Sequence, residues 1–221
     1  MARSARWAAG CFVTGLLTLI PGCATLERNP EVAGPYSDKL SPYNYKEDGS
    51  LAMMIVGVDA ARFIRDEPCV PLFVQVANKS KKITFEIRRE SFVLEDSLGH
   101  QYPLEPVEEV QQKYHRLELD RRLFRQNMAF TATSAGLYSF IRSNFFPSTG
   151  TPGVLAQQVT LPPFAYMEDV LYFPIPETGL NGVPLRLLLK VKDLPEPIFV
   201  LFEVPKTLGI FEKKKAAAEA P

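Results

Sequence analysis

Apolar and polar residues alternate along many short stretches of the chain. The alternation is clearest at 185–192 and 198–204, where every second residue is aliphatic or aromatic. A period of two predicts strands with one buried face. With the short apolar run at 51–59, such patterns predict strands in seven segments, of which 92–102 is a hairpin: 51–59, 70–78, 83–88, 92–102, 168–173, 185–192 and 198–204. Short strands joined by polar turns favour a mainly β, antiparallel sandwich, in which we expect Leu187 and Val200 to be buried.

The segment 91–102 has a turn chemistry that can be assigned in detail. Asp96 can accept hydrogen bonds from the turn backbone, and Gly99 can adopt a positive φ angle. Tyr102 can then pack back across the hairpin. A weaker strand pattern lies at 154–161.

The two-residue period breaks after Pro103. Apolar residues then recur at helical spacings, with Arg121 at one skipped position. These residues are Val107, Val110, Tyr114, Leu117 and Phe124. Glutamates near the start and arginines near the end complement the helix dipole, so the pattern predicts a helix from about 105 to 126. A second helix is expected at 134–144, although Gly136 disfavours it. The strands are therefore expected to flank a helical insertion at about 105–146.

The insertion carries more large apolar residues than one helix face requires. They are Phe124, Phe130, Leu137, Tyr138, Phe140, Ile141, Phe145 and Phe146. One interpretation is that they pack the insertion against the sheet. The other is that some form an exposed surface for a partner, for which Phe140, Phe145 and Phe146 are the candidates.

The first 23 residues have the organisation of a targeting signal. Arg3 and Arg6 precede an apolar run from 7 to 20, which is shorter than a membrane-spanning helix requires. The following Ile20-Pro21-Gly22-Cys23 resembles the signal of bacterial lipoproteins. This resemblance implies cleavage between Gly22 and Cys23, lipidation of Cys23, and anchoring of the protein to a membrane. An ordinary secretory signal and an uncleaved anchor are the alternatives.

The residue after the cysteine, Ala24, resembles an outer-membrane address rather than an inner-membrane one. We therefore expect a bacterial envelope protein that is held at the periplasmic face of the outer membrane. The segment 23–50 is rich in proline and polar residues and is expected to be a flexible linker. Its tyrosines indicate that part of it packs onto the domain. The segment 206–221 is expected to be a solvated tail.

Three stretches resemble the Ig-like domains of uncharacterised bacterial lipoproteins. They are Leu72–Asn78, a strand that ends in Asn before a polar turn; Ser91–Tyr102, with Asp and Gly before a closing aromatic; and Phe199–Pro205 as a final strand. The resemblance implies an Ig-like β-sandwich spanning 51–205, with the segment 105–146 as a departure from it. It implies no catalytic residues.

Composition excludes several classes of function. The chain has 221 residues with 25 basic and 25 acidic side chains, so it has no basic footprint for nucleic acid. Phosphate-loop, dinucleotide, zinc-protease and nucleophile-elbow motifs are absent from it, and we expect no cofactor. Cys69 is expected to be a buried apolar residue rather than a catalytic thiol paired with His100 or His115. Two histidines and one mature thiol at long spacings predict no metal site.

Three functions remain open. The first is a non-enzymatic, lipid-anchored protein that binds or scaffolds other envelope proteins. The second is a lipoprotein that holds an apolar small ligand between helix and sheet, which requires a pocket beneath 124–146. The third is an envelope hydrolase with a dispersed active site, which requires a cleft with converging polar groups.

Overall fold

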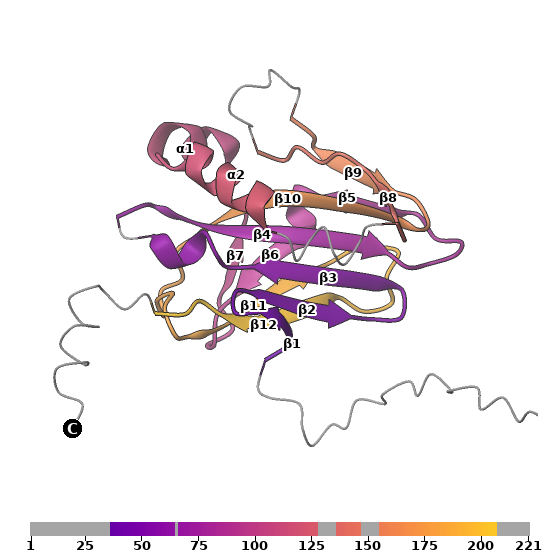
Figure 1. Ribbon diagram of the computed structural model, residues 1–221, viewed down its shortest axis with the longest axis horizontal. Coiled ribbons are helices and arrows are strands. Elements are labelled where there is room, and N and C mark those ends of the chain that lie inside the picture. The colour runs from indigo at the N-terminus through magenta and orange to yellow at the C-terminus, as the bar shows by residue number, and fades with distance from the viewer. Residues whose placement is uncertain (1–35, 65, 128–135, 147–154, 207–221) are drawn as a thin grey trace, which may run out of the picture. The chain divides into compact units, whose positions relative to one another are not determined.

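The larger of two main sheets has six strands in the order β1-β2-β3-β4-β10-β8 (Figure 1). They are β1 (Asp38–Ser41), β2 (Asn44–Asp48), β3 (Ala52–Gly57), β4 (Cys69–Asn78), β10 (Ala165–Pro174) and β8 (Ser139–Phe140). Neighbours are antiparallel, except that β8 runs parallel to β10. The computed structural model describes residues 36–64, 66–127, 136–146 and 155–206.

A second sheet of four antiparallel strands has the order β12-β11-β6-β7. It contains β6 (Phe92–Glu95), β7 (Gln101–Pro103), β11 (Pro184–Leu189) and β12 (Ile198–Glu203). A separate antiparallel pair joins β5 (Phe85–Arg88) to β9 (Gln158–Leu161). The prediction of a mainly β, antiparallel fold is confirmed, and each of the seven predicted segments contains a strand.

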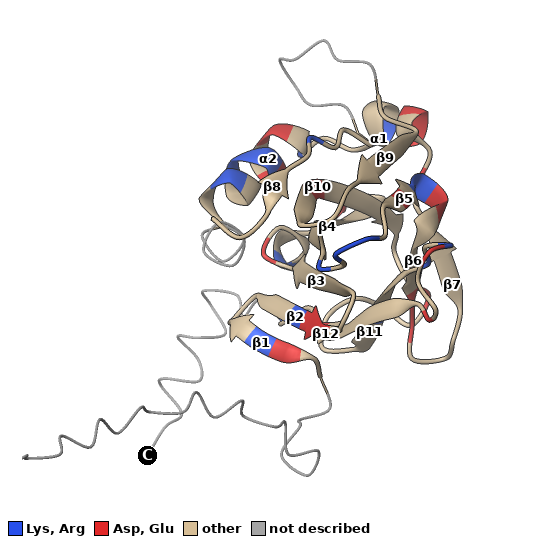
Figure 2. Ribbon diagram, turned by 90° about the vertical axis from the view of Figure 1, so that its right-hand side faces the viewer, with Lys and Arg blue, Asp and Glu red and all other residues tan. Residues whose placement is uncertain are grey.

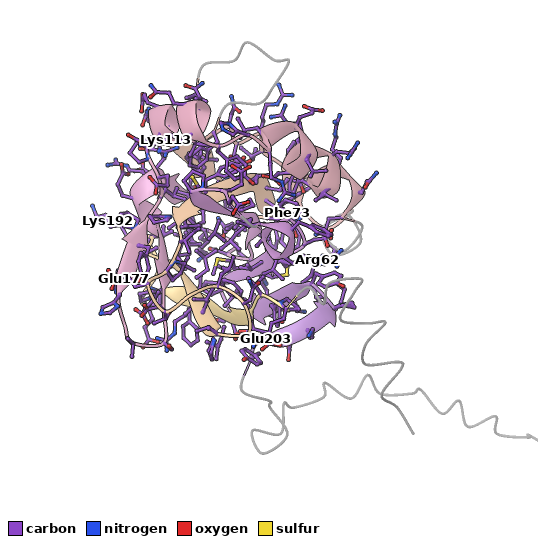
Figure 3. The ribbon with its side chains drawn as sticks, turned by 90° about the vertical axis from the view of Figure 1, so that its left-hand side faces the viewer. Arg62, Phe73, Lys113, Glu177, Lys192 and Glu203 are labelled. Carbon is purple, nitrogen blue, oxygen red and sulfur yellow. The ribbon has the colours of Figure 1, made fainter. Side chains whose placement is uncertain are left out.

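The core lies between the two main sheets and is filled by the inward faces of their strands. Val74 and Val76 of β4 meet Leu187 and Val200 there, and all four side chains are buried, as expected for the last two. The other face of β4 is also covered. Phe73, labelled in Figure 3, packs edge-on against Phe124 of the insertion, with ring centres 5.3 Å apart. Every residue of β4 is therefore buried.

The insertion is less helical than the sequence suggests. The predicted helix 105–126 is two helices, α1 (Val107–Lys113) and α2 (Leu117–Gln126). They separate at Tyr114, whose backbone is extended (φ −100°, ψ 122°). The ring of Tyr114 is thereby buried against Tyr172 of β10, with centres 5.0 Å apart. Packing in the core thus outweighs one continuous run of helical hydrogen bonds.

The predicted second helix at 134–144 is wrong for the described residues 136–144. They form a turn at Gly136, which has a φ angle of +81°, and then strand β8. The main-chain N–H groups of Ser139 and Ile141 donate to Phe164 and Tyr166, both at 2.8 Å. Pairing with the edge of β10 therefore replaces the hydrogen bonds that a helix would have made. Two short 3₁₀ helices complete the described elements, η1 (Ala61–Phe63) and η2 (Arg89–Ser91).

Part of the expected linker belongs to the six-stranded sheet. Within the predicted linker 23–50, β1 and β2 pair with each other and β2 pairs with β3. Tyr45 is 1% exposed and contacts Phe202 of β12, which explains why this polar segment packs onto the core. The signal segment 1–22, the junction at Gly22 and Cys23, and the tail from 207 onward lie outside the described residues.

The turn at 96–99 has the predicted chemistry. One carboxylate oxygen of Asp96 accepts from the main-chain N–H groups of Leu98 and His100, at 2.9 and 3.0 Å. The other accepts from the hydroxyl of Tyr102 at 3.0 Å, and Gly99 has a φ angle of +85°. Asp96 therefore acts as a turn residue, as expected.

The strand register brings several connections to one end of the larger sheet. Ala52 lies opposite Asn78, and Ala77 lies opposite Tyr166, so the start of β3, the end of β4 and the start of β10 share this end. We call it the loop end, and Figure 2 looks onto it. Among the described residues, no helix is both long and apolar enough to cross a bilayer.

Candidate peptide-binding groove

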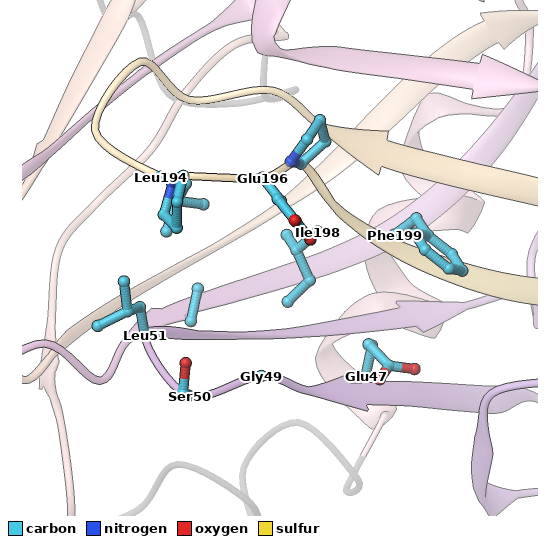
Figure 4. Close-up of a pocket in the computed structure, with 11 residues that line it drawn as sticks. Glu47, Gly49, Ser50, Leu51, Leu194, Glu196, Ile198 and Phe199 are labelled. Atoms are coloured by element: carbon cyan, nitrogen blue, oxygen red, sulfur yellow. The ribbon is translucent and has the colours of Figure 1, made fainter.

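An open groove with a volume of about 310 Å³ lies at the loop end, between the two main sheets (Figure 4). One wall is the β2–β3 connection, from Glu47 to Ala52, and the other is the segment 194–199 that leads into β12. These walls are about 150 residues apart in the chain. A Cβ atom at Gly49 would lie 3.7 Å from Ile198 Cδ1, so the two walls touch at the base of the groove.

The groove combines an apolar surface with two carboxylates. Its apolar residues include Leu51, Leu194, Ile198 and the 43%-exposed ring of Phe199. Glu47 and Glu196 supply the acidic groups. Such a surface suits a ligand that has an apolar part and a positive charge.

The two walls are held by separate interactions. Lys79 Nζ donates to Asp48 Oδ1 at 2.6 Å and to the Gly49 carbonyl at 2.8 Å, which braces the β2–β3 turn. Burial alone would raise the pKa of Asp48, but Lys79 and Lys46 outweigh it and lower that pKa. On the other wall, Pro195 and Pro197 restrict the backbone before β12.

The main chain of Phe199 faces the groove side of β12. In an antiparallel pair, alternate residues direct their N–H and C=O groups to opposite neighbours. Leu201, two residues later, directs its main chain away from β11. It accepts from Ser37 N at 3.0 Å and donates to Ser37 Oγ at 2.9 Å. Phe199 therefore also directs its N–H and C=O groups away from β11, at a sheet edge that an extended peptide can join.

The three aromatic candidates of the insertion do not share a surface. Phe140 is 51% exposed, whereas Phe145 and Phe146 are buried in the core. The expectation that Phe145 and Phe146 face a partner is wrong. Arg89 explains their position, because its guanidinium donates to the carbonyls of Phe145 and Glu105 and stacks on the Phe146 ring at 4.4 Å. One side chain thus holds both ends of the insertion.

The described aromatic residues of the insertion pack closely against the strands. Leu123 and Phe124 pack on Phe73 at the outer face of the sheet. Phe145 contacts Phe92, with ring centres 6.1 Å apart, and Phe146 contacts Tyr172 at 5.0 Å. The groove of Figure 4 lies elsewhere, so these contacts disfavour an apolar ligand between helix and sheet.

The residues considered for hydrolysis are not arranged as a catalytic group. Burial raises the pKa of the Cys69 thiol to about 12, and the negative charges of Glu105 and Glu67 add to the effect. A thiol with this pKa is a poor nucleophile at neutral pH. His100 Nδ1 contacts Asp96 within the turn, and the main-chain N–H of His115 donates to Glu67. Within the described ranges, no three His, Cys, Asp or Glu side chains cluster to hold a metal ion.

A buried carboxyl group was not anticipated from the sequence. Asp120 of α2 is 0% exposed, and its Oδ2 accepts from the hydroxyl groups of Tyr114 and, at 3.5 Å, Tyr172. Burial raises the pKa of Asp120 to about 6, against the opposing effects of Tyr114 and Arg116. The sequence feature that could have identified Asp120 as an inward residue is its helical spacing, three residues after Leu117 and four before Phe124. Arg121 fits the helical period equally well.

Comparison with protein-family models, curated proteins and solved structures finds no match to this chain.

Proposed function

We propose that this protein is a non-enzymatic, lipid-anchored component of the bacterial cell envelope that binds an extended segment of another envelope protein. The observation that carries the proposal is that the main chain of Phe199 is directed away from β11, at the edge of an apolar groove. Strand addition at such an edge takes its affinity from main-chain hydrogen bonds and its specificity from alternate side-chain contacts.

The groove favours a particular class of partner segment. Leu51, Ile198 and Phe199 suit aliphatic or aromatic side chains, and Glu47 and Glu196 suit lysine or arginine. The partner segment is therefore extended, apolar at alternate positions and flanked by basic residues. The partner needs no folded recognition domain, because the groove would supply the template strand.

The anchor is proposed from the sequence alone. Ile20-Pro21-Gly22-Cys23 supports cleavage after Gly22 and acylation of Cys23, and Ala24 supports residence at the periplasmic face of the outer membrane. Two acyl chains already suffice for stable attachment to a bilayer.

We also propose that the two main sheets form an Ig-like β-sandwich. Two antiparallel sheets that share one core support this assignment. Three parts of the structure are additions to the Ig-like pattern: strands β1 and β2, the β5–β9 pair and the insertion.

Photocrosslinking in intact cells tests the groove. A photoreactive amino acid replaces exposed Glu196, at the groove, and in a control replaces Leu98, which is 71% exposed and lies in the 96–99 turn. We expect position 196 to crosslink to discrete proteins, and we expect none of these proteins to crosslink to position 98.

A second substitution tests the strand-addition mechanism. Phe199→Pro removes an N–H that faces away from β11, so it spares the β11–β12 ladder but blocks pairing with a peptide. Phe199→Leu keeps the N–H and is the matched control. Crosslinks at 196 should disappear in Phe199→Pro and persist in Phe199→Leu. Equal crosslinking in the two variants, with both folded by circular dichroism, would refute strand addition.

A further inference from the structure

A second surface at the loop end lies on the β8 side, away from the groove. Its centre is three exposed apolar side chains, Leu137, Phe140 and Phe164, with exposed fractions of 71%, 51% and 47%. Their segments are adjacent, because Ser139 N donates to the Phe164 carbonyl and Phe140 lies opposite Tyr166, with ring centres 5.2 Å apart. We call these three residues the apolar corner.

The backbone holds Phe164 in an unfavourable conformation. Phe164 has a φ angle of +54°, and among the described non-glycine residues no other has a positive φ angle. It occupies a tight turn in which Ala165 N donates to the Pro162 carbonyl at 3.2 Å, and Phe164 N donates to the Asn78 carbonyl at 3.0 Å. Glycine would adopt this conformation without strain. A strained turn that displays an aromatic ring to solvent indicates a function for that ring.

Exposed basic side chains lie on segments next to the apolar corner. Asn78 links the turn after β4 to the turn after β9, since its Nδ2 donates to the carbonyls of Ile83 and Leu161 at 2.7 and 2.9 Å. The first of these turns carries Lys81 and Lys82, both exposed, and Figure 2 shows it as the basic connection between β4 and β5. Arg142, also exposed, follows β8.

Several acidic residues at this end belong to the groove or to ion pairs. Glu47 and Glu196 line the groove between β2 and β12. Asp48 is paired with Lys79 and Lys46. Apolar and aromatic side chains flanked by cations are the chemistry that binds the interface of an anionic bilayer.

The chain enters the domain beside the middle of β2 and the second half of β12. Asp38 lies opposite Lys46, the central residue of β2, and Ser37 N donates to the Leu201 carbonyl at 3.0 Å. Only thirteen peptide bonds separate Cys23 from Tyr36, the first described residue, so the two cannot lie more than about 45 Å apart. A domain anchored through Cys23 therefore stays at the bilayer surface.

We propose that the apolar corner inserts into the headgroup region of an anionic phospholipid bilayer, with Lys81, Lys82 and Arg142 contacting lipid phosphates. This inference rests on the proposed lipid anchor. It assigns the anchored domain one orientation, in which the loop end faces the membrane and the 96–99 turn faces away. The 96–99 turn is at the far end because Glu95 lies opposite Arg186, which lies opposite Leu201 towards the end of β12.

Tryptophan fluorescence tests this orientation directly, because Trp7 is the sole tryptophan of the chain. In a full-length Trp7→Phe background, Phe140→Trp places a reporter in the apolar corner, and Leu98→Trp places an exposed control in the far turn. The proteins are processed in cells, purified and reconstituted into phosphatidylglycerol-containing vesicles with brominated acyl chains. Compared with vesicles that lack bromine, we expect the emission of Phe140→Trp to fall at least twofold and that of Leu98→Trp to remain unchanged. Lys81→Glu with Lys82→Glu should reduce the quenching of Phe140→Trp.

The outcomes separate the two proposals. Vesicle flotation and the mass of the N-terminal peptide report the anchor, and quenching reports the apolar corner. In one outcome, the chain floats with the vesicles while brominated lipid quenches both reporters equally. That result overturns the membrane-docking surface and leaves the anchor intact. That result would also point to a protein rather than a lipid as the occupant of the corner. A chain that carries no acyl groups and does not float overturns the anchor, and with it the orientation.

Discussion

Replacing Asp120 with asparagine should increase stability at neutral pH and weaken its dependence on pH. Asp120 is 0% exposed, and its Oδ1 makes no hydrogen bond among the described residues. Its Oδ2 accepts from Tyr114 and Tyr172. A carboxylate at this site loses its hydration and recovers only part of it through two phenol groups. An amide has the same shape and no charge.

The magnitude follows from the pKa of Asp120. Burial raises that pKa from 3.8 to about 6. At about 1.36 kcal/mol per pH unit, this shift corresponds to a free-energy penalty of about 3 kcal/mol for the ionised form above pH 6. Because the folded-state pKa exceeds the unfolded value, the folded state binds more protons between these values. Its stability therefore rises as pH falls from 6 towards 4. The amide of asparagine has a donor to satisfy, so the expected gain at pH 7 is smaller, about 1–2 kcal/mol.

Urea unfolding of the wild type and Asp120→Asn, measured by circular dichroism between pH 4 and pH 8, checks this expectation. The wild-type unfolding free energy should decrease between pH 4 and pH 6, and the decrease should be smaller in Asp120→Asn. Some decrease should persist, because burial also raises the pKa of Asp169 to about 6. Glu118→Gln, which neutralises a carboxylate exposed on the same helix, is the matched control for the loss of one negative charge.

Two results would refute the reasoning about Asp120. One is a loss of stability at pH 7 in Asp120→Asn with the wild-type slope retained. The other is an equal change of slope in Glu118→Gln. The first would mean that the hydrogen bonds from the tyrosines outweigh the desolvation of the carboxylate. The second would mean that the change of slope does not arise from the burial of Asp120.

Three further predictions concern the core and the anchor. Phe145→Ser should lower the unfolding free energy by about 3–5 kcal/mol, since the Phe145 ring is buried, whereas Phe140→Ser should change it by less than about 1 kcal/mol. Thermal melts that rank the two variants otherwise would contradict the burial pattern. Leu187→Ala should cost about 2–5 kcal/mol and Val200→Ala somewhat less in urea titrations, and a cost below 1 kcal/mol at Leu187 would argue against a shared core. Cys23→Ser should leave the precursor uncleaved and without acyl mass, and the anchor proposal fails if this variant still yields an acylated protein of mature size.

Local patterns were sufficient for most strands. The alternation at 185–192 and 198–204 predicts β11 and β12 because a two-residue period admits one pairing face. The turn at 96–99 could be assigned residue by residue, since its hydrogen bonds join residues no more than six positions apart. The helical pattern at 105–126 also identified the right type of element. It missed the break at Tyr114, because that break is stabilised by a ring contact with Tyr172, which is 58 positions away in the chain.

Contacts between distant segments decided the remaining features. The polar segment with β1 and β2 joins the sheet because Tyr45 meets Phe202, and residues 139–140 form a strand because the edge of β10 offers them hydrogen bonds. The burial of Phe145 depends on Arg89, and the choice of Asp120 over Arg121 as the inward residue depends on the tyrosines that face α2. The groove is formed by two walls that meet only in the folded chain. Periodicity along a chain reports which face of an element is apolar. It does not report what covers that face, because the covering residues come from elements whose positions are set only when the two sheets pack together.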